Sequence, residues 1–240
     1  MSVHRFVLPD PQQAASACAH QILAHLENAL QANNTASLAI SGGESPKAVF
    51  RDLVAARFNW SRVHIFFVDE RCVPPTHEQS NYRMADQNFL IPARVPQRNA
   101  HRVYTELRPD RAAERYAEDI QQVLGLADGE PPAFDVIHLG MGPDGHTGSL
   151  FPGEPLIADR DRIAAAVYVE KLAQYRVTLL PVAILNARHT VVYSPGADKA
   201  EAIQNVLEQD YDPVRMPLQL VRHGRYVAWF MDEPAAARLT

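Results

Sequence analysis

Short apolar segments recur along the whole chain, and each gives way to small or polar residues. Runs of this kind, bounded by turn residues, predict buried strands. Between them lie stretches with helical spacing, such as Gln12–Gln31, where apolar residues fall at steps of three or four. Strands alternating with helices predict an α/β fold, with a single doubly wound, mainly parallel sheet covered by helices on both faces. The expected strands are Ser37–Ile40, Val63–Val68, Phe134–Leu139, Arg176–Leu180, Thr190–Tyr193 and Tyr226–Phe230.

The length and composition fit one globular domain. The chain has 240 residues, 47% of them hydrophobic and 21% charged, which is close to ordinary globular usage. No internal repeat or convincing linker divides it, so we expect one α/β domain over residues 1–240. A net charge of −5 gives no global attraction for nucleic acid or anionic membranes. We therefore expect neither as a partner, and any anion site must be local.

The cysteines and the N-terminus indicate a cytoplasmic protein. Cys18 and Cys72 lie far apart in sequence and match neither a disulfide framework nor a zinc-binding spacing. The first residues lack a basic segment followed by an apolar one, and no run approaches the ~18 apolar residues of a membrane span. The sequence leaves the oligomeric state open, and a monomer is compatible with it.

The segment Ser41-Gly-Gly-Glu-Ser-Pro46 follows the first of these strands. Ligands of open parallel sheets bind beyond the carboxyl ends of the strands, so clusters that follow strands are expected to converge. Ser45 suits a helix N-cap, Pro46 suits the first helical position, and a helical pattern covers Lys47–Ala56. Gly42 and Gly43 let the backbone approach an anion closely, which predicts a phosphate site. A plain turn between strand and helix is the alternative.

Two further clusters carry charged side chains. Asp69-Glu70-Arg71 follows the second strand and is followed by Asn81; these groups can orient sugar hydroxyls and stabilise negative charge, or they can form an ion pair that closes a loop. Lys199 precedes a helical stretch, Ala200–Leu207, where a cation is unfavourable unless an anion compensates it. Arg176 is its expected companion, although both can equally be surface charges.

The cluster from Gly140 to Pro152 contains an Asp-x-His pair, Asp144 and His146. A carboxylate beside an imidazole can fix its tautomer and stabilise its protonated form, which predicts a general base. The alternative is a loop histidine that binds backbone. The glycines also fit the spacing of a dinucleotide fingerprint, but Pro143 interrupts them and the strand lies mid-chain, so we disfavour a nicotinamide or flavin enzyme. His138, inside the apolar strand, is expected in the core.

Other hydrolytic signatures are missing from the sequence. No Gly-x-Ser-x-Gly elbow surrounds Ser149, no His-Glu-x-x-His motif occurs, and no compact set of cysteines and histidines has metal-binding spacing. We expect no metal in the site.

Together these motifs resemble the 6-phosphogluconolactonase family in order and approximate spacing. The similarity runs from about Phe6 to the final strand and rests on four segments: Ser41–Pro46, Val68–Arg71 with Ser80–Tyr82, Leu139–Pro152, and Arg176-Val-Thr with Gly196–Ala200. The resemblance implies a glucosamine-6-phosphate deaminase-like fold, an activity in the pentose phosphate pathway and no cofactor. It implies a general base at His146, a role for Arg71, and a phosphate cradle at the Ser-Gly-Gly loop.

The chain departs from the family pattern at few positions. Glu44 stands where the family usually has a small hydroxyl residue, and Gly148 replaces a common alanine. Both Lys171 and Lys199 are candidates for the family's phosphate-binding lysine, and the sequence does not choose between them.

The resulting hypothesis is hydrolysis of a phosphorylated sugar lactone, 6-phosphogluconolactone. The phosphate is expected on residues 41–45 with Lys199 and Arg176, while His146 and Asp144 activate a water and Arg71 or backbone amides stabilise the oxyanion. Two alternatives remain open. One is an isomerase-deaminase acting on glucosamine 6-phosphate, and the other is a sugar-phosphate sensor without catalysis.

Overall fold

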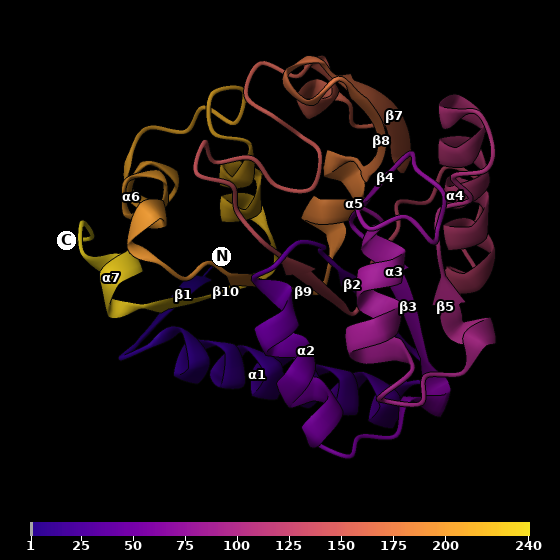
Figure 1. The fold of residues 1–240 in the computed structure, drawn as a ribbon, viewed down its shortest axis with the longest axis horizontal. Coiled ribbons are helices and arrows are strands. Elements are labelled where there is room, and N and C mark those ends of the chain that lie inside the picture. The colour runs from indigo at the N-terminus through magenta and orange to yellow at the C-terminus, as the bar shows by residue number, and fades with distance from the viewer. Residues whose placement is uncertain (1) are drawn as a thin grey trace.

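The computed structural model describes residues 2–240 and contains a parallel sheet flanked by helices (Figure 1). The sheet has seven strands in the order β1-β10-β9-β6-β2-β3-β5, and every paired strand within it is parallel. This confirms the predicted fold class. The strands are β1 (Ser2–Leu8), β2 (Ala36–Ile40), β3 (Val63–Phe67), β5 (Ala100–His101), β6 (Val136–Leu139), β9 (His189–Tyr193) and β10 (Tyr226–Asp232).

A second, three-stranded antiparallel sheet was not expected. Its order is β4-β8-β7, formed by β4 (Asp69–Arg71), β7 (Ala164–Val169) and β8 (Gln174–Leu179). The expected strand Arg176–Leu180 belongs to this sheet, so its assignment to the parallel sheet is wrong. The physical reason is its partner: β8 pairs along its length with β7 in a hairpin, and its other edge takes up β4.

Helices cover both faces of the parallel sheet. They are α1 (Pro11–Ala32), α2 (Pro46–Ala55), α3 (Asn81–Ala85), α4 (Pro109–Leu124), α5 (Pro181–Asn186), α6 (Ala200–Glu208) and α7 (Glu233–Ala236), with a π-helical segment at Asp86–Leu90 and a 3₁₀ segment at Pro217–His223 among the shorter turns. No helix among residues 2–240 is both long enough and apolar enough to cross a membrane.

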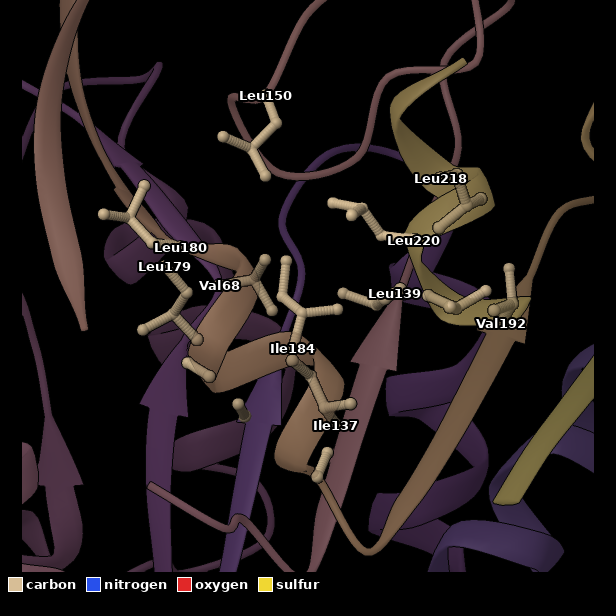
Figure 2. Packing of buried hydrophobic residues seen from close by; sticks show 14 of the residues in the cluster. Val68, Ile137, Leu139, Leu150, Leu179, Leu180, Ile184, Val192, Leu218 and Leu220 are labelled. Atoms are coloured by element: carbon tan, nitrogen blue, oxygen red, sulfur yellow. The ribbon is translucent and has the colours of Figure 1, made fainter. Parts of the chain in front are cut away.

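Two cores lie on opposite faces of the sheet. One packs α1, α2 and the π-helical segment against β2 and β3, with Phe50, Phe67 and Phe89 fully or almost fully buried. The other lies under α4, α5, α6 and the antiparallel sheet. Figure 2 shows this second core, where Leu139 and Val192 on the parallel sheet lie close to Leu218 and Leu220.

The order of the strands places a switch point between β2 and β6. From β2 the chain adds β3 and then β5 on one side, whereas β6, β9 and β10 follow on the other. Helices therefore leave β2 and β6 toward opposite faces, and a crevice opens beyond their carboxyl ends. The loops that begin at Ser41 and at Gly140 both start there. Hydrogen bonds from Ser41 N to His138 O and from Gly140 N to Ser41 Oγ, at 3.1 and 3.3 Å, tie the two loops together.

Candidate active site

One pocket of about 210 Å³ opens at the switch point. Its lining comes from the loops that follow β2, β6 and β9 and from strands β4 and β8, so the clusters meet at one edge of the sheet, as the sequence predicted. Nine of the candidate residues line it: Ser41, Gly42, Gly43, Ser45, Asp69, Arg71, His146, Arg176 and Lys199. Glu44, Met141, Tyr193 and Ser194 are among the other lining residues.

The loop after β2 presents unused backbone donors to this pocket. Among the residues that the structure describes, no group accepts a hydrogen bond from the amides of residues 42–45. Ser45 stands at the N-cap of α2, and Pro46 is the first helical residue, as predicted. The Ser45 side chain makes no capping hydrogen bond, because its backbone is already helical, with φ −57° and ψ −43°. These free N–H groups at a helix N-terminus form an anion-binding arrangement.

His146 and Asp144 form a hydrogen-bonded pair beside the same pocket. His146 Nδ1 lies 2.5 Å from Asp144 Oδ1, while Asp144 itself is not part of the pocket lining. Burial would raise the pKa of Asp144, but hydrogen bonds from Lys171 and His146 outweigh it and lower the pKa to about 2. Because the ionised carboxylate only accepts, we assign the hydrogen to Nδ1, which leaves Nε2 as the basic nitrogen.

Burial also lowers the pKa of His146 itself, although the hydrogen bond to Asp144 and the charges of Asp144 and Asp69 raise it. The net direction is downward, so the imidazole is neutral at neutral pH and able to accept a proton. Phe151 packs against the ring, with 4.3 Å between the centroids. Gly142 lies directly against the imidazole, since a Cβ on residue 142 would fall 2.0 Å from His146 Nδ1. The imidazole is therefore held from several sides.

Asp69 and Arg176 form a second polar group in the pocket. Asp69 Oδ2 accepts from Ser149 Oγ at 2.6 Å and lies 3.7 Å from Arg176 Nη1. Ser149 is fully buried and was not predicted as a functional residue, although it lies directly in the glycine-rich motif. The Nε atoms of Arg71 and Arg176 are buried with no hydrogen-bond partner. Arg71 and Arg176 thus bring two cationic side chains to the pocket lining, and Arg71 Nη1 also donates to the backbone oxygen of Gln79 at 2.6 Å.

Two of the expected binding residues brace the pocket instead of lining it. Glu70 is buried and accepts hydrogen bonds from the backbone amides of Arg71, Asn81 and Tyr82 and from Ser80 Oγ. Glu70 thus closes the loop through three amides and a hydroxyl, and not through the ion pair that the alternative expected. Asn81 Nδ2 donates to the backbone and side chain of Asp69 at 2.8 and 3.1 Å. Both side chains therefore fix the position of β4 and Asp69 from outside the pocket lining.

The two candidate lysines lie in different surroundings. Lys199, at the start of α6, lines the pocket with 17% of its side chain exposed and has Asp198 at 3.2 Å. Lys171 is outside the pocket lining and binds Asp144. Ser194, also unpredicted, has a buried hydroxyl oxygen without a hydrogen-bond partner and lines the pocket close to the sheet. Its sequence signal is its position directly after β9.

His138 is a core residue, as predicted. It is 1% exposed, and burial lowers its pKa to about 4. Among residues 2–240, no cluster of three or more His, Cys, Asp or Glu side chains is arranged to hold a metal ion.

Known proteins share both the sequence pattern and the fold. The family described as glucosamine-6-phosphate isomerases/6-phosphogluconolactonase matches residues 9–229. A 6-phosphogluconolactonase from Nostoc sp. is 33% identical over 236 residues, covering 98% of this chain and 97% of its own. The structure of 6-phosphogluconolactonase from Trypanosoma cruzi superposes with a TM-score of 0.89 at 25% identity, covering 100% of this chain and 97% of that one.

A monomeric glucosamine-6-phosphate deaminase superposes with a TM-score of 0.80 at 17% identity, covering 99% of both chains, which shows a shared fold alone. By contrast, the two relatives with the higher identities are 6-phosphogluconolactonases by name, and this chain matches almost their whole length. The resemblance drawn from the motifs is confirmed. The chain therefore belongs to the 6-phosphogluconolactonase family of lactone hydrolases, within the wider family that includes the glucosamine-6-phosphate isomerases.

Proposed function

We propose that the chain hydrolyses 6-phospho-D-glucono-1,5-lactone to 6-phosphogluconate, the lactonase step of the pentose phosphate pathway. One observation carries the proposal: free amides at a helix N-terminus and a neutral, carboxylate-bound histidine line the same pocket. The first can hold a phosphate and the second can activate water. A lactone with a phosphate at its far end presents one group to each.

The phosphate end of the substrate would rest on residues 42–45. Their amides lie at the N-terminus of α2, where the helix dipole favours negative charge. Lys199 supplies a nearby cation, and its side chain is mostly buried beside the loop. We choose Lys199 over Lys171 for this role, because Lys199 lines the pocket, whereas Lys171 lies outside the lining and binds Asp144.

The chemical step would use His146 as general base. Nε2 takes a proton from water while the water oxygen attacks the lactone carbonyl carbon, and Asp144 stabilises the imidazolium through Nδ1. The tetrahedral intermediate then breaks the bond between the carbonyl carbon and the ring oxygen. The proton on Nε2 passes to that ring oxygen, which becomes the hydroxyl of 6-phosphogluconate. General-base assistance of this kind is typically worth ~10²–10⁴ in rate.

The oxyanion would be stabilised by cationic donors around the carbonyl. Arg71 and Arg176 both line the pocket, and each has a buried Nε without a partner. A donor aimed at a developing oxyanion is worth about 10²–10³ in rate. Asp69, held by Asn81 and Ser149 and close to Arg176, also lines the pocket and would accept a further hydrogen bond from a sugar hydroxyl.

The remaining expectations belong to the same proposal. We treat residues 1–240 as one catalytic domain that needs no cofactor. We place it in the cytoplasm, in keeping with Cys18 and Cys72, which are both free thiols.

The deciding assay measures hydrolysis of the lactone with and without its 6-phosphate, after subtraction of spontaneous hydrolysis. Wild type is expected to prefer the phosphorylated lactone, and His146→Ala to lose ~10²–10⁴ of the rate. Equal rates for wild type and His146→Ala would remove the histidine from the mechanism.

The same samples test the two alternatives. Release of ammonia from glucosamine 6-phosphate would indicate a deaminase. Binding of 6-phosphogluconate in calorimetry without turnover of any lactone would indicate a sensor.

A further inference from the structure

Lys171 makes two contacts next to the histidine. Its ammonium lies 2.6 Å from Asp144 Oδ2 and 4.1 Å from the centre of the Phe151 ring. The other oxygen of the same carboxylate, Oδ1, binds His146, and the Phe151 ring packs on the imidazole. Oδ2 thus binds the ammonium, whereas Oδ1 accepts from the ring and from the backbone amide of His146. The ammonium and the imidazole also share one aromatic neighbour.

The position of Lys171 comes from the antiparallel sheet. It lies in the short turn Glu170–Leu172 that joins β7 to β8, and β8 also carries Arg176. The residue is 27 positions away from Asp144 in sequence. The hairpin therefore delivers one cation to the carboxylate behind the histidine and another to the pocket. Lys171 is outside the pocket lining, so it does not share a surface with the amides of residues 42–45.

Resting on the proposed function, we propose that Lys171 is a positioning residue for the reaction. It holds Asp144 in the orientation that fixes the His146 tautomer. By sharing the carboxylate, it also keeps the imidazole neutral during turnover. Without Lys171, Asp144 Oδ1 still accepts hydrogen bonds from His146, and the full negative charge of the carboxylate then acts on the imidazole. Lys171 thereby shares the carboxylate with the neutral imidazole.

The charged groups that face His146 fix the sign of the effect. Burial lowers the pKa of His146, Asp144 and Asp69 raise it, and Lys171 lowers it. Phe151, the other close neighbour, carries no charge. Removing the ammonium takes away one repulsion and also frees Asp144 to bind the protonated ring more strongly. Both changes raise the pKa of His146, so the acid side of the rate profile must move to higher pH.

Three variants separate this role from general damage to the site. Lys171→Met keeps an unbranched apolar stem against Phe151 and removes the charge. Lys171→Arg keeps the charge and can still reach the carboxylate. Arg162→Met removes an exposed cation that pairs with Asp159 at 2.8 Å and is not among the groups facing His146, so it controls for net charge.

The histidine is titrated directly by NMR in each full-length variant, with its signal identified by its absence from His146→Gln. Because the ammonium is about half exposed and is the smallest of these influences on the pKa of His146, Lys171→Met is expected to raise that pKa by about half a unit. Lys171→Arg and Arg162→Met are expected to stay within a few tenths of a unit of wild type. In the rate assay, the acid limb of kcat/KM for the phosphorylated lactone is expected to shift by the same amount.

An unchanged pKa of His146 in Lys171→Met, or a shift in Lys171→Arg of the same size, overturns the proposal. A loss of rate in Lys171→Met with no shift in either titration also overturns it, since that is what a purely structural role would give. The NMR titration needs no substrate. A protein that fails to hydrolyse the lactone would therefore count against the proposed function and leave the role of Lys171 to be decided by the titration.

Discussion

Gly42 lies so close to Asn81 that a Cβ on Gly42 would fall 1.9 Å from Asn81 Oδ1. The loop proposed to hold the phosphate and the amide that braces Asp69 are therefore in direct contact. Asn81 is buried, and its Nδ2 is held by Asp69. The loop can reach its present position only because residue 42 has no side chain.

We predict that Gly42→Ala displaces this loop. Either the loop or Asn81 must move, so KM for the phosphorylated lactone is expected to rise by about tenfold or more, corresponding to ~1.4 kcal/mol of binding. The free energy of unfolding is expected to fall by ~1–3 kcal/mol, as for other overpacked sites. Steady-state kinetics and urea unfolding measure the two effects.

The double variant Gly42→Ala with Asn81→Ala is the matched control. Asn81→Ala removes the atoms that the new Cβ would meet, so the two changes are expected to cost less together than the sum of each alone. Simple additivity in the urea experiment would show that the contact is not the cause.

Asp144→Asn is expected to lower kcat/KM by ~10²–10⁴ with little change in KM. The amide keeps the size of the carboxylate but removes its charge, and an amide nitrogen facing the ring would favour the wrong tautomer of His146. Lactone hydrolysis at neutral pH measures it. A loss of activity of less than about threefold would contradict the dyad, because even a tenfold loss corresponds to only ~1.4 kcal/mol.

Lys199→Met should act on binding and only on phosphorylated substrate. KM for the 6-phosphorylated lactone is expected to rise by ~10–100-fold, as expected for loss of a charge-assisted contact. Hydrolysis of the lactone that lacks the phosphate should stay as in wild type. Equal losses with both lactones would instead place Lys199 at the reacting carbonyl.

His138 predicts a dependence of stability on pH. Burial lowers its pKa to about 4, whereas an unfolded chain has its ordinary value of 6.5. The unfolded state therefore binds a proton first as the pH falls, so stability is full above pH 6.5 and decreases until about pH 4. At pH 5 this histidine alone is expected to cost ~2 kcal/mol.

The variant His138→Leu should lose less stability between pH 7 and pH 5 than wild type. Both ring nitrogens are buried without partners, so no hydrogen bond is lost in the exchange. His25, whose pKa burial and His189 also lower to about 4, remains and keeps part of the slope. Urea unfolding at both values measures the difference, and identical slopes would contradict the assignment.

The strands of the parallel sheet could be predicted where they are fully buried. Segments such as Val63–Phe67 and Val136–Leu139 are apolar except for one histidine each, because helices cover both faces. The edge strand β1 was not predicted, since its mostly exposed residues follow no clear period. The strand β7 was also missed, because the alanines with which it begins do not favour a strand over a helix.

The gathering of the site could be predicted, but the division of tasks within it could not. Clusters that follow parallel strands must meet at one edge, and nine candidate residues do meet there. Glu70 and Asn81 follow the same strand as Asp69, yet they turn to the backbone behind the pocket. Nothing in the spacing of Lys171 shows that a hairpin folds it onto Asp144, since that contact depends on the pairing of β7 with β8.

The hydrogen bonds between Ser41 and the end of β6 have one more consequence. The loop proposed for the phosphate and the loop that carries the histidine both start from neighbouring strands, whose separation in any sheet is about 4.8 Å. We therefore expect the backbone of the sheet to set the distance between the two loops, and with it the length of substrate that fits. Surface loops elsewhere in the chain can vary without changing this distance.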